Sequence, residues 1–206
     1  VIYGTGDTTA QFVDAVGGYG GFYKCVAARC AADVARIGFY ECNTTLCYAR
    51  SSYSGYQCGS AWPAKTALNC IAVGGTYGFL TPGTVYAWTV KNCIMIAGGS
   101  AGAFAGESRG MTLVKCLALR CTTAFYGRNA SYPLDISSCY YAECYSVQRG
   151  SGYETGTPTQ VGTVLFDWPA ILRAMEPIVW TGIDGLGTAD GAPSTDVFGR
   201  SFGTPP

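Results

Sequence analysis

The chain has 206 residues, of which 49% are hydrophobic and only 13% are charged, and its 13 Lys and Arg balance its 13 Asp and Glu. A neutral chain without a basic run lacks the charge that phosphate neutralisation requires, so nucleic acid is not an expected partner. No stretch approaches the roughly 18 apolar residues of a membrane helix, so no membrane span is expected. The absence of histidine excludes Ser-His-Asp and Cys-His catalysis and mixed-ligand zinc sites.

Short β-strands are the expected secondary structure. The chain contains 29 Gly and 15 Tyr, and clusters of Gly, Ser and Thr separate short apolar runs, which is typical of many strands joined by turns. Residue types that favour helices are few. These features predict an all-β fold.

Residues 1–21 precede the first recognisable repeat. We expect them to form an incomplete first coil or a junction. The chain begins at Val1 and shows no signal peptide, so we expect a processed product or a piece of a longer protein.

Residues 22–155 carry a repeat with a period of about 23 residues. Cys70, Cys93, Cys116 and Cys139 lie 23 residues apart, each after a polar residue and before an apolar run. A fixed period in this range marks a repeat architecture, and the leucine-rich alternative lacks its consensus here. The period therefore predicts a parallel β-helix of about six coils, whose equivalent residues stack in ladders.

Two earlier segments have the same pattern, and some coils contain a second cysteine. These residues complete the predicted ladder. Aligned on their first cysteine, four coils carry C-x4-C, and the other two have Gly75 and Gly98 at the second position. Residues five apart on a strand point to opposite faces, so both cysteines can face inward only if a corner lies between them. The predicted ladder consists of Cys25, Cys42, Cys70, Cys93, Cys116 and Cys139 as first cysteines and Cys30, Cys47, Cys121 and Cys144 as second ones. The predicted corners lie near Arg29, Leu46, Gly74, Ala97, Arg120 and Glu143.

These corners place Arg120 and Glu143 one above the other as an exposed ladder pair. The repeat also favours a packing role for the cysteines, as small buried thiols, over the alternative of a disulfide scaffold. Reduced thiols imply folding in a reducing compartment. The remaining Cys58 falls in an apparent insertion after Cys47, which we expect to protrude as a loop bearing Tyr56 and Trp62, so Cys58 is the candidate exposed thiol.

The phrases Leu113–Cys121 and Ile136–Cys144 resemble repeats of right-handed parallel β-helices, which occur in phage tailspikes, bacterial surface proteins and pectate-lyase-like enzymes. The resemblance covers about residues 20–160 and concerns the fold. A weaker one, in Asp184-Gly185 and Ala192–Arg200, is to the tail that often closes surface β-helix proteins. Residues 156–206 are accordingly expected to form a C-terminal capping tail, with one short helix at Trp168–Met175.

The carboxylates do not predict a catalytic site. A β-helix glycosidase needs two facing carboxylates, but no two of the candidates occupy one column in neighbouring coils, and Asp33 is expected to pair with Arg36. The candidates are Asp14, Asp33, Glu41, Glu107, Asp135, Glu143 and Glu154. We predict no catalytic residue, metal site or cofactor, and keep a polysaccharide-degrading lyase or glycosidase as the alternative.

Tyrosine is the remaining functional signal. An aromatic-rich surface with few charges suits sugar stacking or a protein interface, although such residues also stack in ladders at strand edges. The candidates are Tyr53, Tyr56, Trp62, Tyr126 and Tyr132. We expect a structural or adhesive module on a virion or cell surface that self-associates as a trimer or filament or binds other surface proteins. Glycans are possible ligands, and a carbohydrate-binding module is a third alternative.

Overall fold

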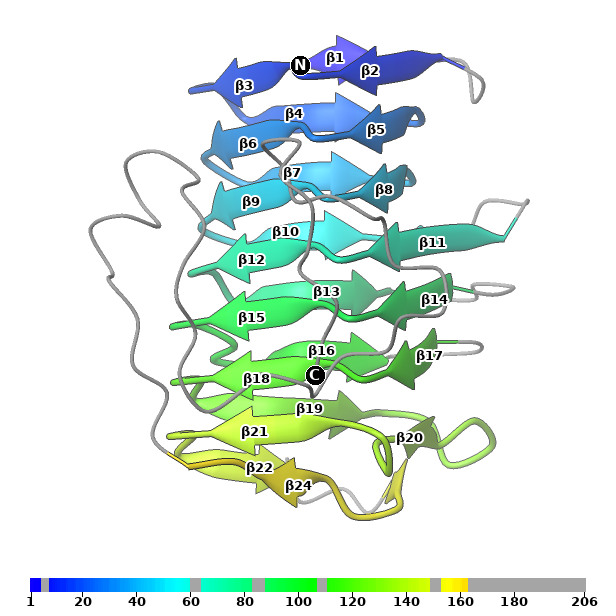
Figure 1. Cartoon of the computed structure of the whole chain (residues 1–206), viewed down its shortest axis with the longest axis vertical. Coiled ribbons are helices and arrows are strands. Elements are labelled where there is room, and N and C mark those ends of the chain that lie inside the picture. The colour runs from blue at the N-terminus through cyan, green and yellow to red at the C-terminus, as the bar shows by residue number, and fades with distance from the viewer. Residues whose placement is uncertain (5–7, 60–63, 83–87, 107–110, 149–152, 163–206) are drawn as a thin grey trace, which may run out of the picture.

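The computed structural model describes residues 1–4, 8–59, 64–82, 88–106, 111–148 and 153–162. These residues form 24 strands that pair in parallel, and successive strands visit three long sheets in turn. Each strand therefore pairs with the strand three places later in the chain, and three successive strands make one coil. Figure 1 shows the coils stacked from β1–β3 to β22–β24. The prediction of an all-β parallel β-helix is confirmed.

The strands belong to the sheets as follows. Sheet A contains β1 (Ile2–Tyr3), β4 (Gly20–Tyr23), β7 (Ile37–Tyr40), β10 (Ser54–Gln57), β13 (Tyr77–Thr81), β16 (Gly102–Gly106), β19 (Thr123–Gly127) and β22 (Ser146–Gln148). Sheet B contains β2 (Thr9–Gln11), β5 (Val26–Ala28), β8 (Asn43–Thr45), β11 (Lys65–Leu68), β14 (Trp88–Lys91) and β17 (Met111–Val114). Sheet C contains β3 (Asp14–Val16), β6 (Ala31–Val34), β9 (Tyr48–Ser51), β12 (Ile71–Val73), β15 (Ile94–Ile96), β18 (Leu117–Leu119), β21 (Tyr140–Ala142) and β24 (Thr159–Gln160). A further pair joins β20 (Leu134–Asp135) to β23 (Glu154–Thr155), and β20 packs against β17.

The number of residues per coil changes along the chain, which corrects the predicted alignment. Phe22 pairs with Phe39 and Phe39 with Tyr56, steps of 17 residues, whereas Tyr56 pairs with Phe79, a step of 23. The extra residues lie between sheet A and sheet B. In sheet C the register continues from Ala31 through Tyr48 to Ile71. Cys70 consequently continues the column of Cys30 and Cys47.

Cys25 and Cys42, which we had aligned with Cys70, lie instead at the corner between sheets A and B. The sequence match was misleading because the second and third coils have a short connection from sheet A to sheet B, whereas this connection is longer from β10 onwards. In these two coils the Phe and Tyr of the motif Phe-Tyr-x-Cys are the last residues of a sheet A strand. In the longer coils the similar motif that ends at Cys70 begins in a sheet B strand.

Many of the corners contain a residue with left-handed backbone. All six predicted corner residues have a φ between 51° and 70°, so these positions are confirmed. They belong to two different corners: Arg29 and Leu46 lie between sheets B and C, and the other four follow sheet C. The amide of the corner residue still donates to the next coil, as from Arg29 N to Thr45 O at 3.0 Å. One left-handed residue therefore turns the chain without interrupting the ladder.

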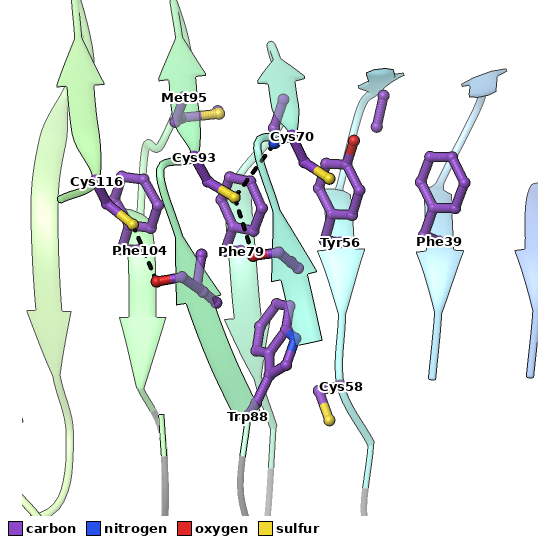
Figure 2. Packing of buried hydrophobic residues seen from close by; sticks show 14 of the residues in the cluster. Phe39, Tyr56, Cys58, Cys70, Phe79, Trp88, Cys93, Met95, Phe104 and Cys116 are labelled. Atoms are coloured by element: carbon purple, nitrogen blue, oxygen red, sulfur yellow. Dashed lines mark hydrogen bonds between the residues drawn. The ribbon is translucent and has the colours of Figure 1, made fainter. Parts of the chain in front are cut away.

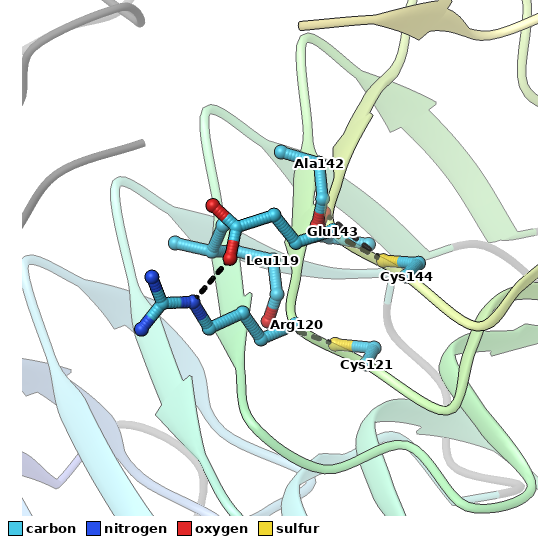
Figure 3. A network of polar contacts seen from close by, with 7 residues as sticks. Leu119, Arg120, Cys121, Ala142, Glu143 and Cys144 are labelled. Atoms are coloured by element: carbon cyan, nitrogen blue, oxygen red, sulfur yellow. Dashed lines mark hydrogen bonds and ion pairs between the residues drawn. The ribbon is translucent and has the colours of Figure 1, made fainter. Parts of the chain in front are cut away.

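The predicted ladder pair at one such corner is also confirmed. Arg120 Nε donates to Glu143 Oε2 at 2.6 Å, and both side chains are partly exposed. Figure 3 shows this pair on the outside of the corner, with Cys121 and Cys144 directed to its other side.

A continuous aromatic stack forms the centre of the interior. Neighbouring ring centroids lie 4.7–5.8 Å apart, and the interplanar angles are 3–20°. Every ring is at most 1% exposed. The stack runs through Phe22, Phe39, Tyr56, Phe79, Phe104 and Phe125 of sheet A. Figure 2 shows four of these rings with the cysteines of the facing strands beside them.

Small residues allow sheet A to approach sheet C. A Cβ added at Gly38 or Gly55 would lie 2.8 Å from the Cβ atoms of Ala49 and Ala72 respectively, closer than real Cβ contacts. Ala49 and Ala72 are fully buried on the inner face of sheet C. The cross-section is therefore wide at the aromatic stack and narrow at this glycine–alanine contact.

Replacing Phe79 by Ala opens the stack in its middle, and we expect the free energy of unfolding to fall by about 3–5 kcal/mol. Tyr56→Phe is the matched control. It keeps the ring but removes the hydroxyl that donates to Cys47 O at 2.7 Å, so its expected cost is about 1 kcal/mol. Urea unfolding followed by circular dichroism measures both, and equal losses would contradict the role of the stack.

Placing glycine at a corner residue with left-handed backbone is expected to stabilise the protein. Ala97 is exposed and has a φ of 51°, a conformation that costs an L-residue about 1 kcal/mol and costs glycine almost nothing. Ala97→Gly should therefore raise the free energy of unfolding by up to about 1 kcal/mol. In the same urea titration Ala72→Gly, within a strand, should lower it. A loss in both variants would show that Ala97 carries no backbone strain.

Candidate functional site

The structure does not bring the predicted aromatic residues together. Tyr53 is half-buried at a corner after sheet C, edge-on to Tyr77 at 5.6 Å. Tyr126, also half-buried, lies in β19, three sheet A strands away from the coil of Tyr53. Tyr132 follows β19 and is 39% exposed. Trp62 lies outside the described residues.

Tyr56 was predicted to lie on a protruding loop, and that prediction is wrong. Its ring is 1% exposed, within β10, and stacks between Phe39 and Phe79. The residues between Cys47 and Tyr56 are therefore not an insertion. It provides β9 and β10, and the sequence match failed because a tyrosine occupies a column otherwise filled by phenylalanine.

Cys58, predicted to be an exposed thiol, is also buried. It is 2% exposed, and burial, with a smaller contribution from the Glu41 carboxylate, raises the pKa of its thiol to about 12. Such a thiol is protonated at neutral pH and reacts slowly.

The described carboxylates bond to separate partners. Arg50 Nε donates to Asp33 Oδ1 at 2.9 Å, because the 17-residue register places these residues directly side by side. The predicted Asp33–Arg36 pair is therefore wrong, and the Arg36 guanidinium lies over the ring of Tyr19, 5.0 Å from its centroid. Glu107 lies outside the described residues.

At the C-terminal end two more carboxylates cap backbone amides. Asp135 accepts from the amide of Ser137 at 3.0 Å, which lowers the pKa of Asp135. Glu154 accepts from the amide of Gly127 at 2.6 Å. Their backbone positions in β20 and β23 are offset by one residue, so the two side chains leave opposite faces of the pair.

Glu41 is the buried carboxylate of the described residues. It is 4% exposed and lies at the corner between sheets A and B, with Oε2 3.5 Å from Lys24 Nζ. The Glu41 charge raises the pKa of Lys24, and burial, followed by the same charge, raises the pKa of Tyr40. The sequence did not predict this polar centre, because Lys24 and Glu41 stood out only as polar residues before a cysteine.

The cysteines form one long column and two short ones. In the long column several thiols donate to a carbonyl of the preceding coil: Cys93 Sγ donates to Ala67 O and Cys116 Sγ to Val90 O, both at 3.3 Å, and the amide of Cys70 points to Cys93 Sγ at 3.4 Å (Figure 2). Burial raises the pKa of Cys93 and of Cys116, so these thiols remain protonated donors. The long column consists of Cys30, Cys47, Cys70, Cys93, Cys116 and Cys139.

The short columns pair Cys25 with Cys42 and Cys121 with Cys144. The Cys25 and Cys42 sulfurs lie 3.5 Å apart, far beyond the length of about 2 Å of a disulfide bond, and all eleven cysteines are free. Among the described residues there is no group of three or more Cys, Asp or Glu that could hold a metal ion. The thiols thus act as packing groups and weak hydrogen-bond donors.

The first coil is the most exposed apolar part of the described chain. Its strands β1, β2 and β3 each have a neighbour on one side only. Five large hydrophobic side chains of this region are 63–80% exposed: Val1, Tyr3, Phe12, Val16 and Tyr19. The described part of the opposite end coil exposes mainly polar residues, among them Gln148 and Gln160, beside the exposed Tyr145, so the two ends of the described β-helix differ in chemistry.

Comparisons with protein-family models, curated proteins and solved structures find no match to this chain. Within the described residues no helix is long and apolar enough to cross a membrane.

Cys144 is expected to be the most reactive described thiol. It is partly exposed, and the hydrogen bond from the Cys121 thiol lowers its pKa to about 7. Alkylation of the native protein by iodoacetamide should therefore rise with pH around 7 and level off above 8, with peptide mass spectrometry locating the label at Cys144. Cys144→Ser should remove this fast phase. Label appearing first at Cys58 would contradict the assignment.

Proposed function

We propose that this chain is a structural β-helix module that self-associates through its N-terminal coil. The observation that carries the proposal is the combination, in one coil, of three one-sided strands and the five exposed apolar side chains of residues 1–19. A free parallel edge offers unpaired amides and carbonyls to another chain, and an exposed apolar patch favours contact with it.

A second copy of the chain is the occupant that fits this surface best. The described part of the C-terminal coil exposes mainly polar residues, so a head-to-tail contact between copies would place Tyr3 and Val16 of one chain against Gln148 and Gln160 of the next. Two N-terminal coils facing each other across a two-fold axis bury apolar surface on both sides. Such an isologous contact closes as a dimer, which favours it over the trimer or filament expected from the sequence.

The module is proposed to belong to a virion or cell surface, as a spike, fibre or decoration component. Low charge and a self-associating β-helix suit a structural element, and unlinked buried thiols suit folding in a reducing compartment before assembly. The fold-level resemblance to tailspikes and surface β-helices points the same way. The separate partners of Asp33, Asp135 and Glu154 favour this role over polysaccharide cleavage.

A charge in the N-terminal coil is expected to weaken self-association. In Tyr3→Asp, a carboxylate replaces a side chain that is 71% exposed, and burying it in the contact should raise the dissociation constant about tenfold or more. Sedimentation velocity over a range of concentrations measures the effect.

The matched control is Tyr145→Asp, which makes the same change at a side chain that is 92% exposed near the other end. It should leave the dissociation constant unchanged. A wild-type chain that remains monomeric at all concentrations, or an equal effect of both substitutions, would overturn the proposal.

A further inference from the structure

Cys121 and Cys144 form a thiol pair that is separate from the long column of cysteines. The amide of Tyr145 donates to Cys121 O at 3.0 Å, the parallel pattern that makes Cys144 the ladder neighbour of Cys121 in the next coil. In the coil before, the same position is Gly98, because the amide of Thr122 donates to Gly98 O at 2.9 Å. The pair therefore has no third thiol on that side.

The two cysteine side chains have the same orientation. Each sulfur lies 3.4 Å from the carbonyl oxygen two residues earlier and 3.4–3.7 Å from the carbonyl oxygen 26 residues earlier, in the coil before. These carbonyls belong to Leu119 and Met95 for Cys121, and to Ala142 and Ala118 for Cys144. Figure 3 shows both side chains directed to the same side of the chain. Two equal orientations one ladder step apart place the sulfur atoms about 4.8 Å apart or closer.

The pair can be reached from solvent. Cys144 is partly exposed, whereas the other ten cysteines are buried, and the next residue, Tyr145, is 92% exposed. Cys121 is 2% exposed and lies behind Cys144 as seen from the surface. The nearby Glu143 carboxylate accepts from Arg120 on the other side of the corner (Figure 3). Solvent contact at this pair is therefore made through sulfur rather than through a carboxylate.

The number and type of these ligands select one class of ion. In the described part of the chain no third Cys, Asp or Glu completes a group with the two thiols. Calcium and magnesium require about six or more oxygen ligands, and structural zinc and iron–sulfur sites require four protein ligands. Two thiolates alone suit a soft ion that binds two sulfur atoms in line, and Cu(I) is the ion of this class that thiolates prefer.

We propose that Cys121 and Cys144 bind one Cu(I) ion between their sulfur atoms. A metal–thiolate bond is about 2.3 Å long, so two such bonds in line span about 4.6 Å, close to the ladder step of about 4.8 Å. A disulfide bond is about 2 Å long and would require the two sulfur atoms to move much closer together. Binding forms two Cu–S bonds and releases the two thiol protons to solvent, and no electron is transferred. The site does not involve the N-terminal coil, so it is independent of the proposed self-association.

Competition for Cu(I) in the full native chain tests the proposal. The ion is supplied without air as its bicinchoninate complex, whose absorbance falls as the protein withdraws copper. The wild-type chain should withdraw one equivalent. Cys144→Ser and Cys121→Ser each leave a single ligand, so each should weaken binding by more than the roughly 10–100-fold that loss of an outer-shell partner costs. The control is Cys58→Ala, which removes a thiol that is 2% exposed and outside the pair, and it should leave the affinity unchanged.

A second measurement on the same samples counts the ligands. X-ray absorption at the copper edge should show two sulfur neighbours, and circular dichroism verifies that each variant is folded. Because Cys144 is partly exposed, its serine variant keeps the test valid if the buried Cys121→Ser variant does not fold. The proposal would be overturned by a wild-type chain that withdraws no copper, by a folded Cys144→Ser variant with unchanged affinity, or by three or more sulfur neighbours around the ion.

Discussion

In-register parallel pairing is the constraint on which the rest of this structure depends. Each coil places its backbone on the coil before it, and a single residue added inside a strand would turn every following side chain to the opposite face. The chain satisfies this constraint with a left-handed residue at many of its corners, as at Arg29 and Ala97. The change that matters most for the cysteines occurs in the connection from sheet A to sheet B, where the step grows from 17 to 23 residues. Sheets A and C remain continuous although the number of residues per coil changes.

This constraint explains which parts of the fold the sequence predicts. The 23-residue period and the C-x4-C spacing suffice for a parallel β-helix, for all six corner positions and for the Arg120–Glu143 pair. These features depend only on residues within one coil or one period apart. The alignment of Cys25 and Cys42 with Cys70 failed because the change of coil length occurs between them, and no local signal marks it. Tyr56 and Cys58 were misplaced by the same error.

The candidate surfaces were harder to predict, because they depend on what lies beside each strand rather than on the strand itself. Val16 and Val73 have the same position in sheet C and similar chemistry, yet the first is 80% exposed and the second 3%. Val16 lies in the first coil, whereas Val73 lies in the middle of the sheet, with Arg50 and Ile96 as its ladder neighbours. The proposed function concerns such a surface, the first coil of the described β-helix.

The column of thiols has a consequence for how this protein can be handled. In the native state the cysteines are out of reach of oxidants, except for the partly exposed Cys144. The unfolded chain, in contrast, exposes eleven thiols that can join in many combinations, none of which exists in the native fold. Disulfide formation and reshuffling take seconds to hours, so oxidation of the unfolded chain by air makes unfolding irreversible. Recovery of the native protein from denaturant should then depend on the presence of a reductant, although the native protein itself needs none.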